Sequence, residues 1–128
     1  MDYLDDDGSA PVERWLAGLG DEARGAIDQR LLMQSANPSW NDQWIKKRKG
    51  TDKIYELRLS WNRREFRLLG CYRPGYIFVL LEGSVEQDSK LQKGADQRAE
   101  QRCQILLREP YRVRRHSYRP RRNMGVAS

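Results

Sequence analysis

Three consecutive segments, KIYELRLSW (residues 53–61), REFRLLGCY (64–72) and YIFVLL (76–81), decide the fold. In the first two segments apolar side chains alternate with polar ones, which is the period of a strand with one buried face. The third segment is apolar throughout, as in a central strand. Together they predict an antiparallel-rich sheet of three to four strands, with the basic segment 44–50 as an edge strand.

The first two segments predict a hairpin that turns at residues 62–63, so that paired residues have numbers adding up to 125. This register keeps the apolar faces together and places Arg58 directly opposite Arg67. Like charges opposite one another destabilise a sheet, so something has to offset them. Two explanations stay open: the neighbouring acids Glu56 and Glu65 on the same face, or an external anion such as a phosphate.

Helical periods flank these strands. Ser9 as the cap residue and Pro11 as an early proline indicate a helix start, and a second helix follows from Asp21 to the break at Pro38. A third helix begins near Lys93. The expected inner faces of the three helices are, in order, Val12, Trp15, Leu16 and Leu19; Ala23, Ala26, Ile27, Leu31 and Gln34; and Ala95, Ala99, Cys103, Leu106 and Leu107. The chain is therefore predicted to be an α+β domain with an N-terminal helical hairpin, a sheet with its helices on one face, and a C-terminal helix.

The charge is unevenly distributed along the 128 residues, whose formal net charge is +6. Residues 1–28 are acidic, residues 29–107 are basic, and the segment 108–128 carries seven arginines against Glu109. We expect one domain over residues 1–107 and a flexible arginine-rich tail over 108–128. Basic segments beside aromatic residues suit nucleic acid, whose phosphates supply most sequence-independent affinity. A solvated surface or an acidic protein partner explains the same charges.

Composition excludes several classes of protein. The longest apolar run, residues 76–81, is far too short to span a membrane, and the acidic start is unlike a signal peptide. The two cysteines, Cys71 and Cys103, lie among apolar residues and indicate reduced, buried thiols of a cytoplasmic protein. The single histidine, His116, is expected to be solvated or to contact RNA, and neither a metal nor a cofactor is expected. Trp40 and Trp44 are expected to pack in the core.

Several short motifs occur in a familiar order. A basic segment Lys46-Lys47-Arg48-Lys49-Gly50 follows Trp44; then come Ile54-Tyr55-Glu56-Leu57-Arg58, Phe66-Arg67-Leu68-Leu69 and Val79-Leu80-Leu81-Glu82-Gly83. Over about residues 9–107 this order resembles the RelE/HigB toxin superfamily, and within it a phage-derived, HigB-like branch with "YELR", "YRLL" and a hydrophobic strand ending in Gly.

The resemblance implies a toxin of a type II toxin–antitoxin module: a metal-independent, ribosome-associated endoribonuclease that cuts mRNA, inhibits translation and is neutralised by an antitoxin. Arg58 and Arg67 match the family's strand arginines, which stabilise the charge that develops on the phosphate. The branch then has Phe-x-Lys-Lys where this chain has Ser84-Val85-Glu86-Gln87. Glu86, Lys90 and Lys93 are therefore the candidates for proton transfer. The candidate RNA-binding residues are Lys46, Lys47, Arg48, Lys49, Arg112, Arg114, Arg115, Arg119, Arg121 and Arg122.

The replacement of both lysines favours a second hypothesis. In that case the chain is a non-catalytic, phage-encoded protein on the same scaffold that binds nucleic acid, a host protein or a phage protein. A third hypothesis is that the chain is a ParE-like inhibitor of gyrase.

Overall fold

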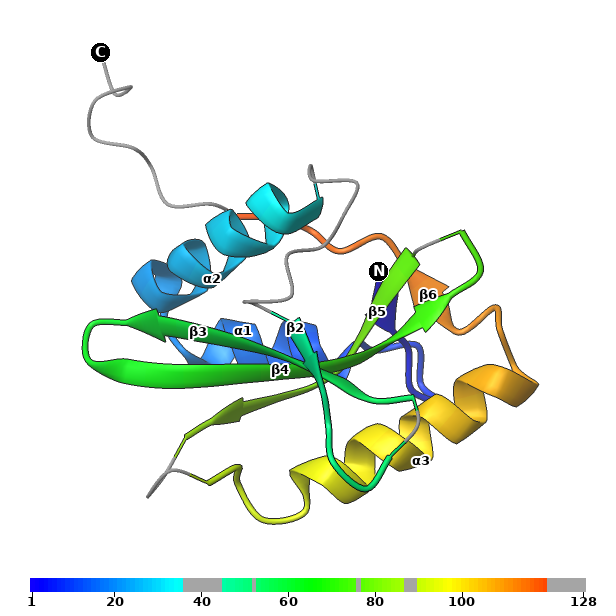
Figure 1. Ribbon diagram of the computed structural model, residues 1–128. Coiled ribbons are helices and arrows are strands. Elements are labelled where there is room, and N and C mark those ends of the chain that lie inside the picture. Colours follow the sequence, from blue (N-terminus) through cyan, green and yellow to red (C-terminus); the bar gives the residue numbers. More distant parts are fainter. Residues whose placement is uncertain (36–44, 52, 76, 87–89, 120–128) are drawn as a thin grey trace.

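A computed structural model of the chain describes residues 1–35, 45–51, 53–75, 77–86 and 90–119. Trp40 and Trp44, which we expected in the core, lie outside the described residues. The helices and strands run in the order β1 (Asp2–Tyr3), α1 (Pro11–Gly18), α2 (Asp21–Ser35), β2 (Ile45–Lys47), β3 (Tyr55–Trp61), β4 (Arg64–Arg73), β5 (Ile77–Val85), α3 (Ala95–Arg108) and β6 (Val113–Arg114) (Figure 1). This order confirms the predicted α+β class with an N-terminal helical hairpin and a C-terminal helix. None of the described helices is both long and apolar enough to cross a membrane.

The six described strands form one sheet in the order β2-β3-β4-β5-β1-β6. Neighbours pair antiparallel except β1, which runs parallel to β5. The expectation of three to four strands holds for β2 to β5. It lacked β1 and β6 because a two-residue strand is too short to show a period in the sequence.

The β3–β4 hairpin has the predicted register. Leu57 pairs with Leu68, and Arg58 pairs with Arg67. The turn residues Asn62 and Arg63 have φ angles of 52° and 63°. Two successive residues with positive φ are typical of the two-residue turns whose twist matches that of the flanking strands.

A bulge in β5 changes which residues face α3. Leu69 pairs with Glu82 whereas Gly70 pairs with Leu80, so Leu81 has no partner of its own. Leu81 packs with the α3 side of the core, and the Glu82 carboxylate accepts hydrogen bonds from two arginines of α3. Because two successive residues face α3, the strand beyond the bulge presents polar side chains on that face.

Helices cover both faces of the sheet, and α2 and α3 lie on opposite sides of it in Figure 1. On the side of α1 and α2 the buried core comprises Val12, Leu16, Ala23, Ile27, Leu31, Ile45, Leu57, Leu59, Phe66, Leu68, Phe78 and Leu80. On the side of α3 it comprises Tyr3, Ile54, Leu69, Cys71, Val79, Leu81, Ala95, Ala99, Cys103 and Leu106. The expectation of helices on one face was therefore wrong. The continuously apolar β5 is the reason, since such a strand buries both of its faces.

Most expected inner-face residues of the helices are buried, with local exceptions. Gln34 is buried in α2, as the period predicted, whereas Leu107 in α3 is 57% exposed. The start of α1 also differs from the prediction. Pro11 is the first helical residue, but Ala10 is the cap and Ser9 bonds Asp7 instead.

Candidate functional site

Arg58 and Arg67 project from paired positions of β3 and β4 on the face that α3 covers, and Glu56 lies between their charges. The Glu56 side chain is 3% exposed. Its Oε1 accepts a hydrogen bond from Arg58 Nε and lies 3.7 Å from Arg67 Nε, and its Oε2 accepts one from Arg48 Nη1 at 2.7 Å. One buried carboxylate thus serves three guanidinium groups.

Of the two acids expected to offset the arginine pair, the structure uses Glu56 and not Glu65. The Glu65 carboxylate accepts a hydrogen bond from Ser60 Oγ near the hairpin turn. Glu86, just beyond the end of β5, takes its place, because Glu86 Oε1 lies 2.9 Å from Arg67 Nη2. The bulge in β5 is what brings Glu86 to this face. The sequence left open whether acids or an external anion offset the two arginines. In the structure Glu56 and Glu86 take up part of the hydrogen-bonding capacity of Arg58 and Arg67.

Arg58 and Arg67 differ in what they can offer a ligand. Arg67 is 5% exposed, and its Nη2 is engaged by Glu86. The Arg58 side chain is 60% exposed and bonds Glu56 through Nε, and its two Nη groups donate no hydrogen bond to an acid in the described part of the chain. These Nη groups form the planar fork with which arginine binds a phosphate or carboxylate through two parallel hydrogen bonds.

Five of the predicted cations line one cleft of about 640 Å³, which we call the arginine cleft: Arg48, Arg58, Arg67, Lys90 and Lys93. The start of α3 closes the cleft on the other side, through Gly94, Ala95 and Asp96. The segment that carries the lysines is fixed to the sheet, because the backbone N–H of Gln92 donates to Ser84 Oγ at 2.8 Å. The sequence alone did not show whether Lys90 and Lys93 reach the strand arginines; the fold places them on the same cleft.

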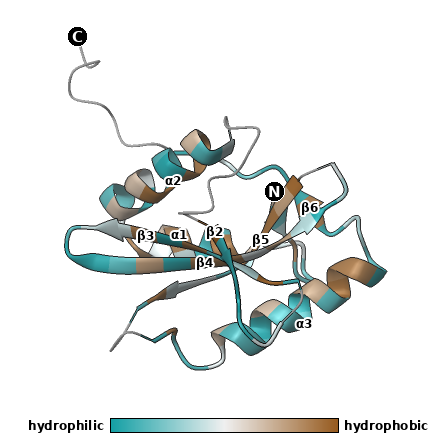
Figure 2. Cartoon of the chain, viewed as in Figure 1, coloured by the Kyte–Doolittle hydropathy of each residue, from teal (hydrophilic) through white to brown (hydrophobic). Residues whose placement is uncertain are grey.

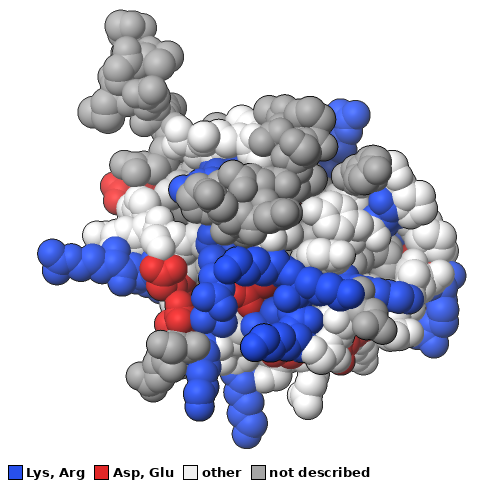
Figure 3. All heavy atoms as spheres, viewed as in Figure 1, with Lys and Arg blue, Asp and Glu red and all other residues white. Residues whose placement is uncertain are grey.

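The basic edge segment is divided between two roles. Lys46 and Lys47 are exposed on β2, as is Lys49 beyond it. Arg48, in contrast, is held in the arginine cleft by Glu56 and by Asp96 of α3, whose carboxylate accepts bonds of 3.0 and 2.6 Å from its Nε and Nη2. Lys and Arg side chains gather over β2 and the segment below it, with acidic atoms visible between them (Figure 3).

The described part of the arginine-rich segment packs on the domain. Strand β6 pairs with β1, so that Arg114 lies beside Asp2 in the sheet. Arg112 forms ion pairs with Asp6 and Glu109, whereas Arg115 and Arg119 are exposed. Arg121 and Arg122 lie outside the described residues.

His116 is buried, so the expectation of a solvated or RNA-contacting histidine was wrong. Its Nδ1 lies 2.8 Å from Asp2 Oδ1, and its Nε2 lies 2.7 Å from Asp28 Oδ1. Burial lowers the pKa of His116, but the hydrogen bonds to Asp2 and Asp28 outweigh it and raise the pKa to about 9. The imidazole is therefore protonated at neutral pH and donates to both carboxylates. We call this arrangement of Asp2, Asp28 and His116 the His116 clasp.

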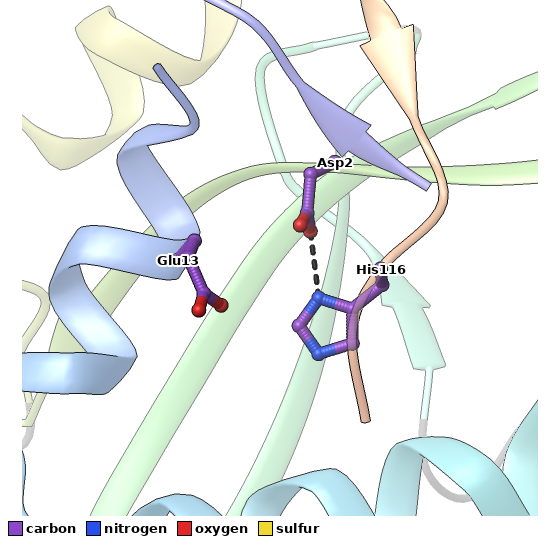
Figure 4. Close-up of side chains that lie close together, drawn as sticks. All are labelled: Asp2, Glu13 and His116. Atoms are coloured by element: carbon purple, nitrogen blue, oxygen red, sulfur yellow. Dashed lines mark hydrogen bonds and ion pairs between the residues drawn. The ribbon is translucent and has the colours of Figure 1, made fainter. Parts of the chain in front are cut away.

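Arg24 completes the charges around the clasp. Its guanidinium donates to Asp28, to both carboxylate oxygens of Glu13 and to the carbonyl of Ser117. Ligand atoms of Asp2, Glu13 and His116 lie within 4.8 Å of one another (Figure 4), a grouping of residue types that metal ions use. Both ring nitrogens of His116 already face carboxylates, and Arg24 binds Glu13, so the protein's own cations fill this space. No local motif signals the clasp, since its members come from both ends of the chain.

The two cysteines are free and buried, as the sequence predicted. They lie in contact, and the hydrogen bond between the thiols raises the pKa of Cys71 and lowers that of Cys103 to about 7. They line a cavity at the other end of α3, away from the arginine cleft.

One family model covers most of the chain: residues 14–104 match the family described as "Phage derived protein Gp49-like (DUF891)". The chain belongs to the Gp49-like family of phage-derived proteins. This family is related to HigB- and RelE-like toxins, and the helices and sheet have the RelE-like arrangement. Neither a curated protein nor a solved structure matches the chain. The Gp49-like match spans the whole arginine cleft and ends before β6. Of the His116 clasp it includes Asp28 but neither Asp2 nor His116.

Proposed function

We propose that this Gp49-like protein is a HigB-like toxin of a type II toxin–antitoxin module, which cuts mRNA at the ribosome without a metal and is neutralised by a cognate antitoxin. The observation that carries the proposal is the exposed Arg58 fork in a cleft that also holds Lys90 and Lys93. A site that cleaves RNA without a metal needs such a group of cations, because negative charge grows on the phosphate in the transition state.

The cleft offers a group for each step of the reaction. A ribose 2′-oxygen attacks the adjacent phosphorus, a base takes the 2′-hydroxyl proton, and the departing 5′-oxygen gains a proton. In our proposal the Arg58 Nη groups bind the non-bridging phosphate oxygens. The Glu86 carboxylate, held by Arg67, takes the first proton, and Lys90 or Lys93 protonates the leaving oxygen.

Glu56 is a positioning residue in this proposal. It accepts its hydrogen bond from Nε of Arg58, so the two Nη groups of that arginine keep their hydrogen-bonding capacity for a ligand. It also fixes Arg48 at the rim of the cleft. The buried acid therefore orients the cations and lowers their mutual repulsion before any phosphate arrives.

The first test is the integrity of translated mRNA after brief induced expression. We expect cleavage by the wild type and none by Arg58→Lys, which keeps the charge but loses the two-pronged hydrogen bond. Arg63→Lys makes the same change at an exposed residue of the β3–β4 turn and should still cut. Intact transcripts in cells that express the wild type would contradict nuclease activity. Cleavage by Arg58→Lys would show that the two-pronged hydrogen bond of Arg58 is not needed for the reaction.

A second candidate function, non-catalytic binding of nucleic acid or of a phage or host protein, is favoured by the ion pair between Glu86 and Arg67. A carboxylate on this arginine also competes with phosphate. The variant Glu86→Gln separates the two functions. If Glu86 is the base, the variant loses cleavage and still binds RNA; if Glu86 only occupies Arg67, RNA affinity rises and no cleavage occurs in either protein. A neighbouring gene for a small helix-turn-helix protein would support the toxin.

A further inference from the structure

A second cavity, of about 480 Å³, lies at the opposite end of α3 from the arginine cleft. It opens where β3 begins and β4 ends, beside the last turns of α3. Its volume falls in the range of about 300–1,000 Å³ that is usual for small-molecule sites. We call it the Cys103 pocket. It shares no lining residue with the arginine cleft, so a ligand of this pocket does not depend on the proposed function.

The walls of the Cys103 pocket are mainly apolar. Leu106 and Leu107 approach from α3, and Pro74 and Pro110 follow β4 and α3. Tyr55 and Tyr72 border the pocket from β3 and β4, but their rings pack edge to face, with centroids 5.0 Å apart, in the core on the α1 and α2 side of the sheet. Figure 2 shows that the C-terminal end of α3 is the apolar part of this helix. Leu107 is 57% exposed, so an apolar ligand in the pocket would remove part of a large aliphatic side chain from water.

Two cations, Lys53 and Arg73, also line the pocket, and neither forms an ion pair within the described residues. This is unusual in a molecule whose arginines mostly pair with acids. Arg24, Arg48 and Arg112, for example, each bind two different carboxylates. Glu100 of α3 lines an adjoining cavity, which shares Lys53 and Cys103 with the Cys103 pocket, but it forms no ion pair with Lys53. The Cys103 pocket therefore combines apolar walls with an unmatched positive charge.

The thiols give the pocket a built-in reporter. Cys71 and Cys103 both line it, and Lys53 is close enough to favour the thiolate of each. The hydrogen bond from Cys71 lowers the pKa of Cys103, which favours its thiolate and therefore its reaction with thiol reagents. A ligand in the pocket would block the approach of a thiol reagent to Cys103.

We propose that the Cys103 pocket binds an apolar group that carries a carboxylate. The apolar part lies against Leu106 and Leu107 of α3 and the prolines Pro74 and Pro110, and the carboxylate lies between Lys53 and Arg73. Two sources have this chemistry: a free aromatic or branched aliphatic acid, and the C-terminal residue of a partner polypeptide.

The test compares matched probes by calorimetric titration of the full chain. The free-acid pair is 4-phenylbutyrate and the neutral 4-phenylbutanol. The peptide pair is a tetrapeptide that ends in phenylalanine, with a free or an amidated C-terminus. We expect saturable binding of at least one carboxylate probe, about tenfold tighter than its neutral partner, together with slower alkylation of Cys103. Binding of only the free acid or only the free-carboxylate peptide identifies the source, and either result supports the proposal.

Variants locate the binding. Lys53→Met and Arg73→Met should each lower the affinity for the carboxylate probe several-fold and leave the affinity for the neutral probe unchanged. Arg63→Met removes an exposed cation from the β3–β4 turn and should change neither. The proposal is overturned if no probe binds saturably, if neutral and charged probes bind equally, or if Lys53→Met and Arg73→Met bind the carboxylate as the wild type does. Binding that leaves the alkylation rate of Cys103 unaltered would also overturn it.

Discussion

At the scale of single residues, the molecule places acids where its arginines are most crowded. Glu56 is the clearest case, because its buried carboxylate meets Arg48, Arg58 and Arg67. A buried ion pair gains little over an apolar pair of the same shape, but removal of one member leaves the other charge without compensation. Glu56 is therefore expected to matter for stability as well as for the arginine cleft.

The variant Glu56→Gln tests this role. We expect its free energy of unfolding to fall by about 3–5 kcal/mol, because three guanidinium groups lose their shared counter-charge. Glu65→Gln is the matched control, since Glu65 is an exposed acid of the same sheet face, and its effect should stay within about 0.5 kcal/mol. Urea denaturation of both variants gives the comparison. Equal losses of stability in the two variants would show that the Glu56 carboxylate stabilises the fold no more than an exposed acid does.

His116 makes stability depend on pH. Its pKa is raised from 6.5 to about 9 in the folded chain, because its bonds to Asp2 and Asp28 outweigh its burial. The folded state thus binds the proton more tightly. The resulting stabilisation, about 3 kcal/mol, is fully present below pH 6.5 and is lost as the pH rises through about 9. Unfolding free energies of wild type and His116→Gln between pH 6 and pH 9.5 should converge at the alkaline end. A constant difference between the two would contradict a protonated His116.

At the scale of helices and strands, β5 decides how the sheet meets its two layers of helices. Its bulge turns polar residues toward α3, and beyond the bulge Gly83 faces α1. A Cβ at Gly83 would overlap the indole of Trp15, whose ring also packs edge to face on Phe66. The close approach of α1 to β5 therefore requires a residue without a side chain.

We expect Gly83→Ala to destabilise the protein by about 1–3 kcal/mol, because the added methyl group overfills the contact with Trp15. Gly18→Ala is the control, since a Cβ at this last residue of α1 meets no atom within 4 Å. In thermal unfolding, the midpoint temperature of Gly18→Ala should equal or exceed that of the wild type. Trp15→Leu should be less destabilising in the Gly83→Ala background than in the wild type, and additive effects would exclude the overlap as the cause.

At the scale of the whole molecule, the two ends of the described chain hold one another. Strand β1 lies between β5 and β6, and the His116 clasp fixes the segment after β6 to α2. The backbone N–H of Arg119 also donates to Asp28. The arginine-rich segment is thus part of the domain up to this residue, and the candidate RNA contacts Arg121 and Arg122 follow it.

Two truncations test this division. A chain that ends at Tyr111 loses β6 and the clasp. We expect its free energy of unfolding to fall by about 3–5 kcal/mol, because Asp2 loses His116, Asp28 keeps only Arg24 of its described partners, and the pairing of β6 with β1 is lost. A chain that ends at Arg119 keeps the clasp and should retain this stability. If Arg121 and Arg122 contact RNA phosphates, the chain that ends at Arg119 should bind single-stranded RNA with a weaker salt dependence than the full chain. The slope of log K against log salt should be smaller by about 1.4. An unchanged slope would remove these two arginines from the RNA contacts.

The sequence by itself determined the helical hairpin, the β3–β4 register with Arg58 opposite Arg67, and the identity of the candidate cations, because these features depend on local periods and on a two-residue turn. Only the tertiary structure decided that helices cover both faces of the sheet, that Glu86 bonds Arg67 while Lys90 and Lys93 line the same cleft, and that His116 is buried against Asp2 and Asp28. These contacts join residues far apart in the chain. They depend on a bulge and on two-residue strands, neither of which leaves a period in the sequence.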